Sequence, residues 1–95
     1  MRIFHHVHEL IGNTPLVEIN QFQLPKGVRL FAKLEFMNPG GSVKDRLGLE
    51  LIQDAFERGL LQEGGTIIES TAGNTGIGLA LASLNRRINV ILCVP

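Results

Sequence analysis

The sequence predicts an α/β fold with a parallel-sheet βαβ architecture. An apolar strand at 66–69 and a β-branched strand at 89–94 flank a helix that is expected from residue 74 to about residue 86. Strand, helix and strand within roughly 30 residues favour a parallel pair joined by a right-handed crossover. Clustered glycines lie between these segments and support the division into separate elements.

The elements nearer the N-terminus are expected to be shorter. Residues 5–11 indicate a short helix, and turn-forming residues end it before Pro15. Alternating apolar and polar side chains predict strands at 16–19 and 28–36, with a loop around Pro25 between them.

A longer helix is predicted from about Val43 to Arg58. Ser42 is a suitable N-cap, and Asp45, three residues later, would complete a pair that resembles a capping box. Asp54 and Arg58 have the i, i+4 spacing of a helical ion pair. An apolar stripe at helical spacing consists of Leu47, Leu51, Ile52, Ala55 and Phe56.

The composition is that of a soluble globular chain. Of the 95 residues 44% are hydrophobic and 19% charged, and the formal net charge is zero. This balance argues against nucleic acid or a membrane surface as the main partner, because both select a basic excess. No apolar run is long enough to span a bilayer. The single cysteine, Cys93, cannot form an intramolecular disulfide, which fits a cytoplasmic protein.

Residues 38–46, with the sequence NPGGSVKDR, form the first candidate site. A glycine-rich turn brings Lys44 into the first turn of a helix, where the helix dipole disfavours an ammonium by a few tenths to about 1 kcal/mol. The dipole therefore favours the neutral amine that an imine-forming lysine requires. On these residues alone, an ordinary capped helix with a solvated lysine is the alternative interpretation.

Residues 70–76, with the sequence STAGNTG, form the second candidate site. They follow a parallel strand at its carboxyl end, where α/β proteins bind ligands. Backbone N–H groups at the helix start can bind an anion, and Thr71, Asn74 and Thr75 add side-chain donors. A plain strand-to-helix turn is the alternative. A dinucleotide site is rejected, because the glycine order is wrong and the expected acidic residue is missing.

Three segments, taken together, resemble the pyridoxal-phosphate-dependent β-family (fold type II), and most strongly its cysteine synthase and cystathionine β-synthase branch. They match the family's N-terminal signature, its cofactor-lysine segment and its substrate-carboxylate loop. In chain order they are IGNTPLV at 11–17, KLE at 33–35 with NPGGSVKDR at 38–46, and TAGNTGIGLA at 71–80. Three ordered motifs with compatible spacing are specific, whereas one alone would be weak.

This resemblance implies the cofactor pyridoxal 5'-phosphate (PLP) and a role for each matching residue. Lys44 would bind PLP covalently and act as acid and base at the substrate Cα, and Asn74 would hydrogen-bond the ring oxygen of PLP. Thr71, Gly73 and Thr75 would hold the substrate α-carboxylate. The implied reaction is a lyase or transferase β-replacement on serine or O-acetylserine by sulfide or homocysteine, with carbanion chemistry supplied by the cofactor.

The chain is also expected to be the N-terminal part of a longer, homodimeric protein. A parallel sheet needs helices on both faces, and the elements here are too few. Residues 1–40 would contribute strands to the larger cofactor domain, and residues 41–95 would begin the α/β region that holds the PLP lysine and the substrate loop. The family's phosphate loop and the residue that faces the pyridine nitrogen would follow Pro95, so we expect no useful turnover from the 95 residues alone.

Two other functions stay open at this stage. One is another enzyme of the family, such as a serine or threonine dehydratase, and the other is a truncated, non-catalytic chain. Ala72 stands where many family members carry serine, and its effect on the substrate is not predicted. No metal is expected at His5, His6 and His8, since no cysteine or acidic cluster converges there. Cys93 is expected to be a buried core residue.

Overall fold

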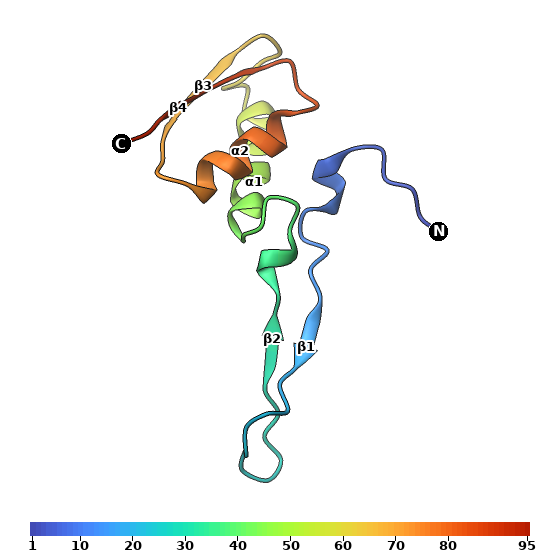
Figure 1. The fold of residues 1–95 in the computed structure, drawn as a ribbon. Helices are drawn as coiled ribbons and strands as arrows, with labels where there is room; N and C mark the ends of the chain where they lie inside the picture. The colour runs from blue at the N-terminus through green and yellow to red at the C-terminus, as the bar shows by residue number, and fades with distance from the viewer.

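The fold of the computed structural model, which describes residues 1–95, has two parts (Figure 1). Two helices and a two-stranded sheet pack together at one end, and an extended hairpin projects away from them. The elements in chain order are η1 (Val7–Leu10), β1 (Leu16–Glu18), β2 (Phe31–Lys33), η2 (Glu35–Met37), α1 (Lys44–Glu57), β3 (Thr66–Ser70), α2 (Asn74–Ser83) and β4 (Asn89–Cys93).

The predicted βαβ unit is confirmed. Strands β3 and β4 pair in parallel from Thr66 opposite Asn89 to Ser70 opposite Cys93, and α2 connects them. A separate antiparallel pair, β1 with β2, forms the base of the hairpin, with Leu16 opposite Lys33. The α/β class follows from the parallel pair and the two helices packed together beside it.

The core lies where α1 meets α2. Its buried apolar side chains are Ile52, Leu61, Leu79 and Ala82. The two helices approach closely because Gly48 and Gly78 have no side chains at the crossing. A Cβ on Gly48 would overlap the backbone of Gly78 and lie 2.6 Å from the Leu79 nitrogen. Backbone contact of this kind fixes the relative position of the helices, since interiors tolerate little extra volume.

Three predicted elements are shorter in the structure. The helix expected at 5–11 is only a 3₁₀ helix, η1, over Val7–Leu10. The strand expected at 28–36 pairs only over β2, because the chain then turns into η2 and brings Glu35 toward α1. The helix expected to reach residue 86 ends at Ser83, whose hydroxyl donates to the Leu79 carbonyl at 2.6 Å. Beyond it, Arg86 N–H bonds to the carbonyl three residues back, which closes turns rather than α-helix.

The apolar pattern is only partly buried in this chain. Ile52 of the predicted stripe is in the core, whereas Leu47 and Leu51 are about two-fifths exposed. The expectation of a buried Cys93 is wrong. Strand β4 alternates between its two faces, and Cys93 shares the exposed face with Ile91. The helices are also too short or too polar to cross a membrane.

Candidate active site

Helix α1 begins at Lys44, close to the predicted start. The backbone N–H of Lys44 donates to the Ser42 hydroxyl at 3.1 Å, so Ser42 does accept a hydrogen bond from the first turn. The capping box expected between Ser42 and Asp45 does not form. The Asp45 carboxylate instead accepts from the Gly40 N–H at 2.6 Å, because the chain folds back at the glycine turn.

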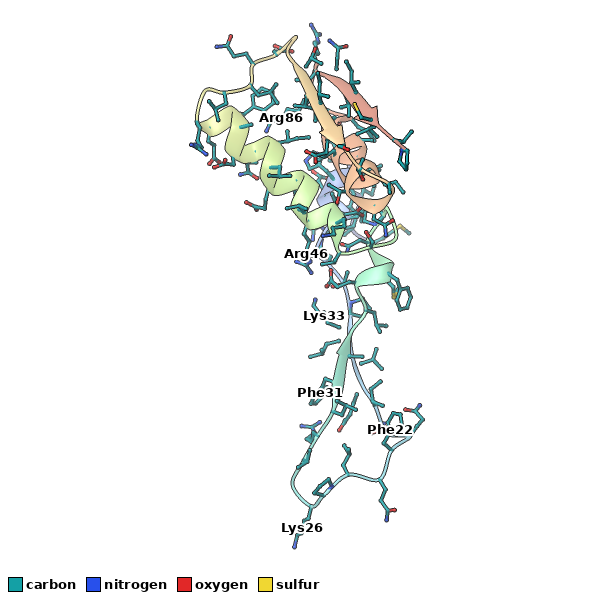
Figure 2. The ribbon with its side chains drawn as sticks, turned by 90° about the vertical axis from the view of Figure 1, so that its left-hand side faces the viewer. Phe22, Lys26, Phe31, Lys33, Arg46 and Arg86 are labelled. Carbon is teal, nitrogen blue, oxygen red and sulfur yellow. The ribbon has the colours of Figure 1, made fainter.

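An ion pair between Arg46 and Glu35 holds the start of α1 to the N-terminal segment. Arg46 Nε donates to Glu35 Oε2 at 2.8 Å, and Nη2 donates to Oε1 at 3.0 Å. The same Nη2 donates to the Gly12 carbonyl at 3.0 Å and to the Thr14 hydroxyl at 3.2 Å. Figure 2 shows Arg46 at the junction between α1 and the hairpin. Arg46 thus joins the first and second sequence motifs.

Thr14 and Asn38 complete this polar cluster, and both are buried. Thr14 donates to Glu35 at 2.7 Å and accepts from Lys33 Nζ at 2.8 Å. Asn38 Nδ2 donates to Glu35 Oε2 at 2.9 Å, while its carbonyl oxygen accepts from the Gly12 N–H at 2.8 Å. Hydrogen bonds from Arg46, then from Thr14, lower the pKa of Glu35 to about 2. The reciprocal bond to Glu35 raises the pKa of Arg46.

The 70–76 segment forms the predicted strand-to-helix loop. The Thr71 hydroxyl oxygen accepts from the N–H groups of Gly73 at 3.1 Å and Gly76 at 3.3 Å, and so caps α2. The N–H groups of Asn74 and Thr75, which begin the helix, bond to no acceptor in the chain. Free donors therefore remain at this helix start, although the Gly73 N–H is already used by Thr71.

The helix crossing brings Lys44 beside the helix that starts at Asn74. A Cβ on Gly78 would overlap the Lys44 carbonyl oxygen, so the two backbones touch. Gly78 lies four residues after Asn74, which is about one helical turn of 5.4 Å. A lysine side chain has a flexible four-carbon stem that suits it to such a span. The structure thus places the backbone of the lysine segment against the helix that carries the second candidate site, residues 70–76.

Lys44 is the one lysine that lies at the helix crossing and has an amine without a partner in the chain. Of the chain's three lysines, Lys33 uses its amine on Thr14, and Lys26 lies at the far tip of the hairpin (Figure 2). The Lys44 side chain is exposed, and Asn74 is exposed as well. No surface cavity of these 95 residues is lined by Lys44 or by residues 70–76, so these residues alone do not enclose a pocket.

The histidines and Cys93 form no metal cluster. The structure contains no group of three or more metal-binding side chains. His8 instead contacts Asn85 at the end of α2, and its ring stacks on that of His6 with centroids 5.6 Å apart.

Comparison with known proteins decides the family. A family model described as "Pyridoxal-phosphate dependent enzyme" matches residues 7–95. The chain belongs to this pyridoxal-phosphate-dependent family. It is 56% identical over 95 residues to the O-acetylserine dependent cystathionine beta-synthase of Bacillus subtilis, covering all of this chain and 31% of that protein.

Solved structures agree with this assignment. The cystathionine beta-synthase of Bacillus anthracis superimposes with a TM-score of 0.85 at 73% identity, over all of this chain and 36% of that one. The O-acetylserine dependent cystathionine beta-synthase of Helicobacter pylori superimposes with a TM-score of 0.91 at 44% identity, over all of this chain and 32% of that one. The chain therefore spans about a third of the length of these relatives.

The residues present fit the cofactor of the family. The aldehyde of PLP requires an amine. Its anionic and oxygen acceptor groups require N–H donors. Lys44 offers an amine with no partner in the chain, and the α2 start offers the Asn74 amide and two free backbone donors. Sequence reasoning missed the cluster of Thr14, Glu35 and Asn38, although each lies in a quoted motif. The sequence feature that could have indicated this cluster is the presence of polar residues close to the glycine turns at Gly12 and Gly40.

Proposed function

We propose that the protein in its full-length form is a PLP-dependent β-replacement enzyme of sulfur amino-acid metabolism. It joins a thiol, sulfide or homocysteine, to the Cβ of serine or O-acetylserine. The observation that carries this proposal is the contact between the Lys44 backbone and Gly78, which brings the lysine segment against α2, the helix that carries the second candidate site. The three relatives above are named as cystathionine β-synthases, two of them O-acetylserine dependent, which supports this branch over a dehydratase or a non-catalytic chain.

Lys44 is proposed to hold PLP covalently and to move a proton at the substrate Cα. Its own hydrogen-bonding capacity is unused in this chain, so the amine is available for both tasks. Asn74 Nδ2 is proposed to donate to the ring oxygen of PLP. PLP, when bound, supplies the electron sink that stabilises charge at Cα.

The substrate α-carboxylate is proposed to lie at the α2 start, against Thr71, Gly73 and Thr75. The Thr71 oxygen accepts two N–H groups, which leaves its O–H free to donate to a carboxylate. Thr75 contributes its hydroxyl and its free backbone N–H. Gly73 contributes space rather than a donor, because nothing lies within 4 Å of where its Cβ would be. The helix dipole adds to the attraction of an anion at this point.

The architecture of the whole protein is part of the proposal. Residues 1–40 are proposed to contribute strands to the larger cofactor domain, and residues 41–95 to begin the second α/β region, in a cytoplasmic homodimer. The exposed apolar side chains Ile68 and Ile91 on one face of the β3–β4 pair support further covering elements. We propose that the 95 residues alone bind PLP weakly and do not turn over.

The test uses the full-length protein and the 95-residue chain side by side. We expect the full-length protein to show visible absorbance from lysine-bound PLP, and borohydride reduction to fix the cofactor on Lys44 in a mass-spectrometric peptide map. Lys44→Ala should abolish both signals, while Lys26→Ala at the hairpin tip, the matched control, should change neither. O-acetylserine should shift the spectrum, and product analysis with sulfide or homocysteine identifies the thiol.

Two outcomes would contradict the proposal. Cofactor fixed on a lysine other than Lys44 would remove its central residue. A full-length protein that eliminates ammonia from serine or threonine, without adding a thiol, would place it among the dehydratases.

A further inference from the structure

The carboxylate of Asp45 is the most deeply buried side chain of the protein. It has no exposed surface, and one of its oxygens, Oδ1, has no hydrogen-bond partner. Burying a carboxylate without full compensation is unfavourable. Packing does not explain a buried carboxylate next to Lys44, but the contacts of Asp45 do.

The contacts of Asp45 lie on both sides of the Lys44 backbone, at the glycine turn before the helix and at α2. Oδ2 accepts a short hydrogen bond of 2.6 Å from the Gly40 N–H, across the glycine turn that precedes the helix. Gly40 itself has no room for a side chain, because a Cβ there would overlap Oδ1 and lie 2.7 Å from Leu81 Cδ1. On the other side, a Cβ on Gly78 would lie 3.1 Å from the Asp45 Cα. Asp45 is therefore enclosed between the turn and α2.

Lys44, by contrast, is held only through its backbone. Its N–H bonds to Ser42, its carbonyl touches Gly78, and its side chain makes no hydrogen bond or ion pair. The direction in which the amine leaves the helix is thus set by the turn before it and the residue after it. Asp45 joins these two.

The geometry points to Asp45 as the positioning residue of Lys44: its carboxylate locks the Gly40 turn to the first turn of α1 and so aims the amine. This role rests on the proposed function of Lys44. The negative charge also lies in the first turn of a helix, where it is favourable. The acceptor oxygen facing Gly40, rather than the charge, is the feature that aims the lysine.

The experiment compares Asp45→Asn with Asp45→Leu in the full-length protein. The two replacements have similar shape, but only asparagine keeps an acceptor for the Gly40 N–H. The rate of covalent PLP attachment to Lys44 is followed by visible absorbance after adding PLP to the apo protein. Hydrogen exchange of the Gly40 amide is measured in parallel, without cofactor. Glu50→Ala, on the exposed side of α1, is the control.

Asp45→Leu should attach PLP about tenfold more slowly or worse, since small displacements of a reacting group are costly, and should lose protection of the Gly40 amide. Asp45→Asn should stay within about threefold of the unchanged protein and keep that protection. If Asp45→Leu does not fold, Asp45→Ala takes its place. Equal attachment rates in the asparagine and leucine variants overturn this role and leave the proposed function intact. Failure of the unchanged protein to attach PLP at Lys44 overturns both.

Discussion

Arg46 and Glu35 face each other through two hydrogen bonds, at 2.8 and 3.0 Å, across eleven residues of chain. The pair ties the helix that begins at Lys44 to the segment that precedes it. Bidentate geometry of this kind needs the planar guanidinium, because an ammonium cannot offer two parallel donors.

Arg46→Lys should therefore act as a disruptive change. Lysine keeps the positive charge but loses the paired hydrogen bonds from Nε and Nη2 to Glu35. It also loses the hydrogen bonds from Nη2 to Gly12 and Thr14. We expect the thermal midpoint to fall by several degrees and PLP attachment at Lys44 to slow. Circular dichroism melting and visible absorbance measure the two effects. Arg58→Lys, at an exposed i, i+4 pair with Asp54, is the control and should change neither.

Stability should fall in acid between about pH 4.5 and pH 2. The pKa of Glu35 is lowered from 4.5 to about 2, so the folded state binds this proton less readily than the unfolded state. Its contribution is complete above the unfolded pKa and is lost as pH falls through the folded pKa. Urea unfolding at a series of pH values measures this slope. In Glu35→Gln the slope over this window should be reduced, and an unchanged slope would mean that Glu35 is not its source.

Gly78→Ala should destabilise the helix crossing. The added Cβ would overlap the Lys44 carbonyl oxygen, and backbone cannot move aside as a side chain can. We expect a loss of about 1–3 kcal/mol or more in the free energy of unfolding, as for overpacked interiors. Gly73→Ala is the matched control, since nothing lies within 4 Å of its Cβ. Denaturant unfolding should therefore show a large loss of unfolding free energy for Gly78→Ala and a small one for Gly73→Ala.

Thr71→Val should affect both the α2 cap and substrate binding. Valine has the same shape but cannot accept from Gly73 and Gly76, and loss of such a cap costs about 1 kcal/mol. We also expect a higher KM for the amino-acid substrate, because the free O–H is lost. Thr71→Ser keeps the hydroxyl and should restore both stability and KM. A variant that is destabilised with an unchanged KM would limit Thr71 to capping.

The local elements and the family motifs could be predicted from the sequence. The βαβ unit was predicted from two apolar strands that flank a helix preceded by a glycine-containing loop. Helix α1 was predicted from the helical spacing of its apolar residues and from the glycine turn before it. The Asp54–Arg58 pair was also predicted correctly, because both residues lie on one helix and their spacing is fixed.

The contacts of Asp45 and Glu35 and the exposure of Cys93 could not be predicted in this way. Asp45 was expected to cap its own helix, yet it bonds to Gly40, because the turn folds back under α2. Glu35 was expected in a strand, yet it turns into η2 to meet Arg46. Cys93 was expected inside and lies on an exposed face.

The sequence by itself determined the βαβ unit, the helix that begins at Lys44 and the three motifs that the chain carries. The tertiary structure alone decided that the lysine segment lies against α2 and that Arg46 joins two motifs far apart in the chain. The physical reason is that propensity and periodicity act over a few neighbouring residues. The contact of Gly48 and Gly78, by contrast, depends on two helices meeting where neither has a side chain.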